Sequence, residues 1–141
     1  MLEVTKIFRF EMAHAIHGYE GSCRNIHGHS YELHVTVAPK SIPDTYFGST
    51  GFVIDFKELK RIIQDNIIRK FDHWLVLSEA FMKTHPGLET LENVVVWEVE
   101  PSAENILLYF KKTIEAELPQ QVQLSALRLY ETADSYASWT R

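Results

Sequence analysis

The chain has 141 residues, which is long enough for one domain with a buried core. Its formal net charge is −5 at pH 7 and no lysine or arginine run marks a phosphate-binding surface, so we expect no nucleic-acid partner. No stretch approaches the roughly 20 apolar residues of a membrane helix, and the N-terminus lacks a signal-peptide pattern. The single cysteine, Cys23, excludes an internal disulfide. These features predict a soluble, cytoplasmic, single-domain protein over residues 1–141.

Two alternating segments open the chain. Residues 3–14 and 27–38 carry apolar side chains at every second position, which predicts two strands joined by the loop 15–26. If the strands form an antiparallel hairpin, the apolar side chains of both lie on one face. In chain order that face is predicted to hold Phe8, Phe10, Met12, His14, His27, His29, Tyr31, Leu33, Val35 and Val37.

Helical patterns follow the hairpin. The segment 50–71 predicts a helix that begins after Asp55, with Glu58 three residues later as in a capping box. A second apolar stripe of helical spacing follows Ser102, which is the candidate N-cap of a second helix. We therefore expect two helices.

The remaining strands are predicted from composition and alternation. Residues 94–100 are rich in β-branched side chains and predict a short strand, residues 122–131 alternate, and residues 135–141 predict a short last strand. The resulting order is β-β-α-α-β-β, apart from the short strand between the helices. It predicts an α+β domain with a four-stranded antiparallel sheet and two helices packed on one face.

Histidines converge at one end of the predicted hairpin. His27 and His29 point the same way from their strand, and His14 ends the first strand where His27 begins the second. Three imidazoles without a fourth protein ligand match an open catalytic zinc site, in which water or substrate takes the fourth position. His34 lies on the opposite, polar face and is expected at the solvated surface.

Cys23 lies in the loop that closes over these histidines, and two roles remain open for it. Positive charge from zinc and imidazoles favours a reactive thiolate, whereas a thiolate bound to the metal closes a structural site. Asp72 and His73 follow the first predicted helix. If both reach Cys23 in space, they supply the base, relay and orienting group that activate a nucleophile or general base.

Glu131 continues the strand face that carries Leu127 and Leu129, so its carboxylate is expected to point into apolar surroundings. A buried carboxylate needs a partner. An arginine meets that need, and so does a ligand with an N–H/NH₂ edge, such as a 2-amino-4-oxo pteridine. The alternative is that the strand frays and exposes Glu131.

With these residues in place, the chain resembles the 6-pyruvoyl-tetrahydropterin synthase and 6-carboxytetrahydropterin synthase family over nearly its whole length. The motifs that carry the resemblance are, in order, FEMAH (10–14), CRNIHGHSY (23–31), GFVIDF (51–56), FDHWLVL (71–77), PSAEN (101–105) and YETADSY (130–136). The resemblance implies the tunnelling fold, whose sheets join around a trimer barrel. It also implies a homohexamer of two stacked trimers with active sites at subunit interfaces.

The resemblance further implies residue roles, carried over motif by motif. They are Zn²⁺ binding by His14, His27 and His29, proton transfer by Cys23, Asp72 and His73, and pterin contacts by Glu131, Glu104 and Ser102. The family usually has threonine where this chain has Ser102, which keeps the hydroxyl.

The implied substrate is 7,8-dihydroneopterin triphosphate. Because the compact chain resembles bacterial members, we expect a zinc-dependent lyase that forms 6-carboxy-5,6,7,8-tetrahydropterin, releases acetaldehyde and triphosphate, and feeds 7-deazaguanine and queuosine synthesis. The alternative within the family is the 6-pyruvoyl branch, which eliminates triphosphate, keeps the side chain and feeds tetrahydrobiopterin synthesis. Two alternatives from other classes are a non-catalytic structural zinc module and a zinc hydrolase with a water-activating carboxylate beside the metal.

Overall fold

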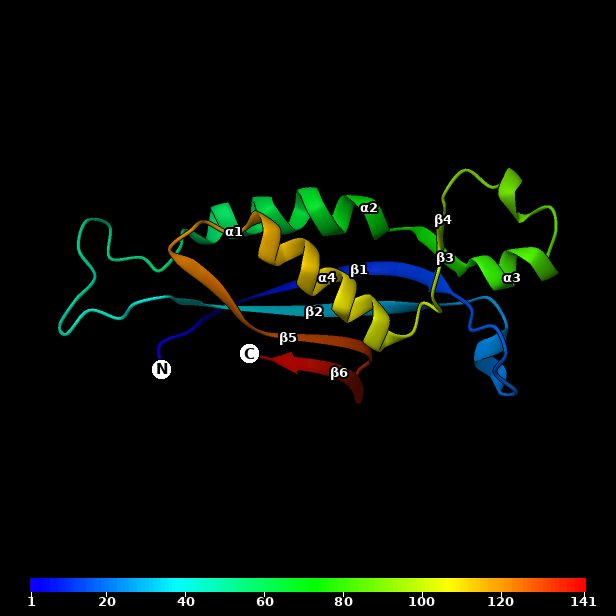
Figure 1. Cartoon of the computed structure of the whole chain (residues 1–141), viewed down its shortest axis with the longest axis horizontal. Helices are drawn as coiled ribbons and strands as arrows, with labels where there is room; N and C mark the ends of the chain where they lie inside the picture. Colours follow the sequence, from blue (N-terminus) through cyan, green and yellow to red (C-terminus); the bar gives the residue numbers. More distant parts are fainter.

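The computed structural model describes all 141 residues. Its helices and strands, with two short 3-10 turns and one π-helical segment labelled η, are β1 (Val4–His14), η1 (Ser22–Arg24), β2 (His27–Pro39), α1 (Phe56–Ile63), η2 (Gln64–Ile68), α2 (Arg69–Phe71), β3 (Trp74–Ser78), α3 (Glu79–Thr84), η3 (Leu88–Thr90), β4 (Val94–Trp97), α4 (Ala103–Glu117), β5 (Val122–Thr132) and β6 (Ser135–Thr140). The helices α1 and α4 lie over one face of the sheet (Figure 1).

The predicted hairpin is confirmed. β1 and β2 pair antiparallel along the whole of β1, in a register that places His14 opposite His27 and Phe10 opposite Tyr31. The alternation in both strands therefore buries one shared face against the helices. His34 is on the other face, as predicted, but its side chain is only 21% exposed because it packs on Tyr130 and bonds the Glu32 carboxylate at 2.7 Å.

Both predicted helix starts are also confirmed. The Asp55 carboxylate accepts the Lys57 backbone N–H at 2.8 Å, and the Ser102 hydroxyl accepts the Asn105 N–H at 3.2 Å. The first helix changes character midway, because α1 runs through the π-helical segment η2 into α2. A single turn of this kind inserts an extra residue into the helix.

The sheet is larger than predicted and is mixed. Its strand order is β4-β3-β1-β2-β5-β6, with β3 parallel to β1 and β4 parallel to β3. The α+β class is confirmed, but the four-stranded antiparallel sheet with two helices, in the order β-β-α-α-β-β, is wrong. β3 was not predicted because apolar and polar side chains do not alternate in its sequence, WLVLS. Such uniform apolar runs are typical of buried parallel strands. The helix α3 begins at the next residue, which further obscures the strand.

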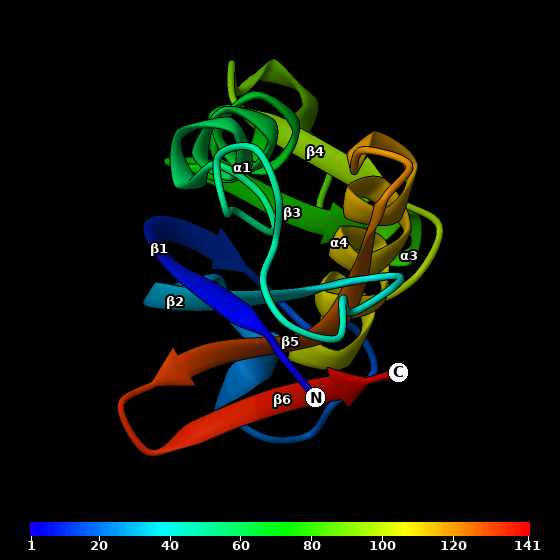
Figure 2. The ribbon, with the colours of Figure 1, turned by 90° about the vertical axis from the view of Figure 1, so that its left-hand side faces the viewer.

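The core lies between the helices and the central strands. A single cluster of 23 buried hydrophobic residues joins β1, β2 and β5 to α1, η2, α2 and α4. Figure 2 shows the sheet from its end, with β6 at the bottom and the twisted continuation through β3 to β4 at the top. This core fixes the end of the hairpin at which the histidines lie. No helix in the structure combines the length and apolar character needed to span a membrane.

Candidate metal centre and substrate pocket

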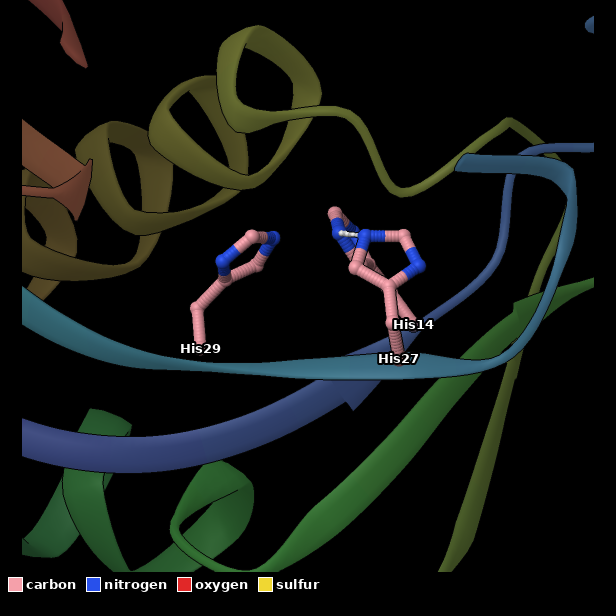
Figure 3. A group of neighbouring side chains, drawn as sticks. All are labelled: His14, His27 and His29. Atoms are coloured by element: carbon pink, nitrogen blue, oxygen red, sulfur yellow. Dashed lines mark hydrogen bonds between the residues drawn. The ribbon is translucent and has the colours of Figure 1, made fainter. Parts of the chain in front are cut away.

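Three imidazole rings meet where β1 ends and β2 begins (Figure 3). His14 lies directly across the ladder from His27, and His29 lies opposite Met12, so all three side chains project from the same face. Their ligand nitrogens lie within 4.8 Å of one another. The structure therefore brings together the three residues that the sequence predicted as metal ligands, in a cluster that could hold a metal ion.

Hydrogen bonds orient two of these rings for metal binding. His14 Nδ1 lies 2.7 Å from the Pro101 carbonyl oxygen, and His27 Nδ1 lies 2.7 Å from the Asn25 carbonyl oxygen. Because a carbonyl only accepts, each Nδ1 carries the proton and each Nε2 presents its lone pair. The two Nε2 atoms are 3.0 Å apart, a repulsive arrangement unless a cation lies between them. The donor set thus fits a metal ion, with the carbonyls as orienting partners.

The environment of His14 favours the same protonation state. Its burial lowers the pKa of His14 most, and the neighbouring His27 and His29 rings disfavour a further positive charge on it. The Pro101 carbonyl and the Glu131 carboxylate act in the opposite direction without reversing the net shift. The pKa of His14 therefore falls below its ordinary value, and the neutral ring that binds metals is the favoured form at pH 7.

A cavity of about 450 Å³ opens beside the histidines. The site residues predicted from the sequence that line it are His14, Cys23, Ser102, Glu104 and Glu131. Its volume is in the range of small-molecule sites. The rest of the lining, which includes Ile16, Tyr19 and Tyr136, was not predicted from the sequence. Loop residues such as Tyr19 follow no periodicity, whereas Tyr136 lies within the motif YETADSY and was detectable there.

Glu131 points at the histidines. Its Oε1 lies 3.6 Å from His14 Nε2 and 4.0 Å from His29 Nε2, and the side chain is 28% exposed. The pairing of β5 with β6 shifts register between Tyr130 and Thr132, and such bulges redirect side chains. The surroundings of Glu131 therefore differ from the apolar ones predicted, because its carboxylate faces imidazoles and the cavity.

Cys23 lies in η1 as an exposed free thiol. Its backbone carbonyl accepts the Ile16 N–H at 2.8 Å, which holds this loop beside the end of β1. Its sulfur is not among the ligand atoms that converge in the histidine cluster. The geometry therefore favours an open metal site with the thiol at the wall of the cavity over a closed four-ligand site.

Asp72 and His73 form a rigid corner elsewhere on the chain. The Asp72 carboxylate lies 3.1 Å from His73 Nδ1 and accepts the Glu11 N–H at 2.8 Å, while the His73 N–H donates to the Glu11 carbonyl at 2.6 Å. His73 has a left-handed backbone (φ 65°), and the Asn93 amide donates to its carbonyl. The His73 side chain is 77% exposed and lines a second cavity with Glu11 and Ser30. One chain alone does not bring this pair and Cys23 into the same cavity.

Tyr31 is a further polar residue near the cluster. Its ring stacks on Phe10 at 5.2 Å, and its centroid lies 5.4 Å from that of His29. The residue is 1% exposed, yet its hydroxyl has no hydrogen-bond partner in the protein. Burial, with a smaller contribution from the Glu131 carboxylate, raises the pKa of the Tyr31 phenol well above its usual range. The sequence placed Tyr31 on the buried face but carried no signal that its hydroxyl lacks a partner.

Known proteins resemble the chain over its full length. Proteins named 6-carboxy-5,6,7,8-tetrahydropterin synthase from Rickettsia bellii and Haemophilus influenzae are each 29% identical to it. The alignments cover 96% of this chain and 98% of the Rickettsia protein, and 99% of both chains for Haemophilus. The protein of the same name from Synechocystis sp. is 33% identical over an alignment of 138 residues, and the alignment covers 96% of this chain and 91% of the relative.

Solved structures share the fold. An uncharacterized protein from Wolinella succinogenes superposes with a TM-score of 0.76 at 20% identity, covering 99% of this chain and 98% of that one. The 6-pyruvoyl tetrahydropterin synthase of Caenorhabditis elegans superposes with a TM-score of 0.68 at 18% identity, covering 99% and 95%. The family model described as 6-pyruvoyl tetrahydropterin synthase matches residues 3–141. Because that match spans nearly the whole chain, the protein belongs to the 6-pyruvoyl tetrahydropterin synthase family.

Proposed function

We propose that this protein is a zinc-dependent lyase that converts 7,8-dihydroneopterin triphosphate to 6-carboxy-5,6,7,8-tetrahydropterin, with release of acetaldehyde and triphosphate. The observation that carries the proposal is the full-length similarity to proteins named for this product, at 29% to 33% identity. The product of this reaction would feed 7-deazaguanine and queuosine synthesis. The cavity beside the histidines supports the proposal because it combines a metal cluster, a thiol and a carboxylate.

The carboxylate of Glu131 suits recognition of the pterin ring. A carboxylate can accept two parallel hydrogen bonds from the ring N–H and the exocyclic NH₂. Tyr19 and Tyr136 line the same cavity and offer flat apolar surfaces to a planar ring. The Ser102 hydroxyl oxygen caps α4, but its proton remains free to donate to a ring acceptor. Glu104, two residues after Ser102, lines the same cavity.

The side chain of the substrate would lie beside the histidines. His14, His27 and His29 would hold zinc, which when bound supplies a Lewis acid for the hydroxyls and carbonyl of that side chain. Cys23, at the wall of the same cavity, would take and return protons at the side-chain carbons. Glu131 would meanwhile keep the ring in one orientation relative to these two groups.

Asp72 and His73 would act on Cys23 from a neighbouring copy of the chain. Within one chain His73 lines a different cavity from Cys23, and both edge strands of the sheet, β4 and β6, are unpaired on their outer side. The family resemblance implies a homohexamer built as a dimer of trimers, with active sites at subunit interfaces, and we propose this assembly for the present chain. Six chains of 16.4 kDa give a mass of about 98 kDa, which light scattering would measure.

Mixed hexamers test the shared site. Cys23→Ala and His73→Ala homohexamers are both expected to be inactive. If each active site takes Cys23 from one chain and His73 from another, co-expression of the two variants restores activity to about one quarter of the wild-type sites. If both residues act within one chain, no mixed hexamer recovers activity, which would contradict the interface model.

Product analysis tests the reaction itself. The zinc-loaded protein is incubated with 7,8-dihydroneopterin triphosphate and the products are identified by mass. Acetaldehyde together with a carboxypterin supports the proposal. Formation of 6-pyruvoyl-tetrahydropterin selects the alternative branch of the family instead, and formation of neither product refutes both.

A zinc hydrolase is the second candidate, because a carboxylate does lie beside the metal cluster, with Glu131 Oε1 3.6 Å from His14 Nε2. Glu131→Gln separates the two functions. In a pterin synthase this variant weakens binding of the pterin ring, whereas in a hydrolase it lowers turnover of substrates that carry no pterin. A structural zinc module is less well supported, since Cys23 is not part of the cluster.

We also infer that residues 1–141 act as one domain and that the protein works in the cytoplasm. The single large core cluster draws on strands and helices from the first to the last third of the chain. Cys23 is an exposed free thiol, and a catalytic thiol of this kind depends on a reducing compartment.

A further inference from the structure

A second, smaller cavity adjoins the pocket beside the histidines. It has a volume of about 300 Å³ and lies where the loop between β1 and β2 meets α3, at the right-hand end of the molecule in Figure 1. Ile16 and Tyr19 line both cavities, so the two share a wall. Cys23 lines the larger cavity and the next residue, Arg24, lines the smaller one.

The charges of the two cavities differ. The larger one is lined by the carboxylates of Glu104 and Glu131 and by no lysine or arginine. The smaller one is lined by Arg24, His17 and His85 and by no carboxylate. We call it the basic cavity. A triphosphate carries several negative charges and needs cationic groups and N–H donors, so the lining of the basic cavity suits it better than walls that carry two carboxylates.

The His85 ring of the basic cavity is held at the C-terminal end of α3. The His85 ring stacks flat on Phe81, with ring centroids 4.0 Å apart and an angle of 5° between the planes. Its Nδ1 lies 3.0 Å from the Phe81 carbonyl and donates there, so Nε2 offers an N–H to an anion in the protonated ring. Glu100 accepts the His17 N–H at 2.6 Å, but Glu100 does not line the cavity.

We propose that the basic cavity is the subsite for the triphosphate end of the substrate, with Arg24 as its main cationic contact. The proposal rests on the function proposed above, because only a phosphorylated pterin would span both cavities. The pterin ring then lies against Glu131, the reacting carbons lie at Cys23 and the histidines, and the phosphates pass Tyr19 to reach Arg24. The larger cavity thus binds the pterin ring, and the basic cavity binds the triphosphate leaving group.

Titration with inorganic tripolyphosphate tests the subsite directly. We expect the wild-type protein to bind it and Arg24→Gln to bind it about 10-fold or more weakly, the loss of one charge-assisted contact. His85→Gln, a second variant, is expected to weaken binding in the same direction. Arg69→Gln is the matched control, since it removes the same charge from an exposed position on α2 that does not line either cavity. Equal affinities of Arg24→Gln and Arg69→Gln would overturn the proposal.

Kinetics separate a failed subsite from a failed function. For a protein that turns over 7,8-dihydroneopterin triphosphate, Arg24→Gln raises KM about 10-fold and leaves the affinity for unphosphorylated 7,8-dihydroneopterin within twofold of wild type. Normal turnover with an unchanged KM in Arg24→Gln refutes the subsite while the function stands. If the wild-type protein forms no pterin product, the proposed function fails, and the tripolyphosphate titration still decides the subsite.

Discussion

The buried hydroxyl of Tyr31 gives the most direct test of the structure. The residue is 1% exposed and its hydroxyl oxygen has no partner, while its ring keeps its contacts with Phe10 and His29. A buried hydroxyl without a hydrogen bond destabilises the folded state by about 1–3 kcal/mol. Tyr31→Phe removes only that atom. We therefore expect this variant to be more stable than the wild type by about that amount in metal-free protein.

The pH dependence follows from the raised pKa of Tyr31. In the unfolded chain the phenol loses its proton near pH 10, whereas in the folded protein it holds the proton to higher pH. Above pH 10 the folded state therefore binds more protons, and wild-type stability falls as pH rises. One such group lowers the free energy of unfolding by about 1.4 kcal/mol per pH unit. Phenylalanine has no proton to lose, so the stability advantage of Tyr31→Phe grows by that slope above pH 10.

Urea unfolding of both proteins between pH 8 and pH 11 measures the difference. Tyr46→Phe is the control, because Tyr46 is 88% exposed and this substitution removes a hydroxyl that lies in water rather than in the core. If Tyr31→Phe is less stable than wild type at pH 8, the hydroxyl makes a favourable bond and the reasoning fails. A difference that does not change above pH 10 would show that the phenol titrates normally when folded.

Three further outcomes are expected. His29→Ala should reduce bound zinc from about one ion per chain to a small fraction, whereas Cys23→Ala should keep the zinc. Metal analysis after dialysis measures both. Loss of zinc in Cys23→Ala would favour the closed structural site. Ser102→Ala should lower the free energy of unfolding by about 1 kcal/mol, because it removes the N-cap of α4. An unchanged midpoint of urea unfolding would contradict the capping role of Ser102. His73→Gly should abolish turnover. Its free energy of unfolding should equal that of the wild type or exceed it by about 1 kcal/mol, since glycine tolerates the left-handed backbone at this position. Marked destabilisation would mean that the exposed imidazole has a structural role.

The alternation of side chains along the strands predicted the three-histidine cluster. Alternation placed His27 and His29 on one face, and antiparallel pairing brought His14 opposite His27. The helix caps at Asp55 and Ser102 were predictable for the same reason, because each depends on residues within one turn.

The remainder depends on contacts that no local pattern encodes. The parallel strand β3 was hidden by its uniform apolar run, and its pairing with β1 is a long-range contact. The direction of Glu131 depends on a bulge where β5 meets β6, and the position of His73 depends on backbone bonds to Glu11. The roles of Asp72 and His73 came from the family motifs, which carry no information on the cavity that His73 lines in one chain.

The π-helical segment η2 has a consequence for the evolution of the gene. It gives the helix between Asp55 and Asp72 one codon more than a regular helix of the same span would use. Asn66 accommodates the extra residue by donating its side-chain amide to the Ile62 carbonyl at 2.8 Å. The wide turn absorbs the extra residue, so loss of one codon within it would close the helix to regular α-turns and leave its two ends in place. Loss of a codon elsewhere in the helix would instead turn everything beyond it by about 100° and draw it back by about 1.5 Å. A deletion elsewhere in the helix would pull the Asp72–His73 corner away from Glu11. Single-codon deletions between positions 64 and 68 should therefore be tolerated better than deletions in the rest of the helix.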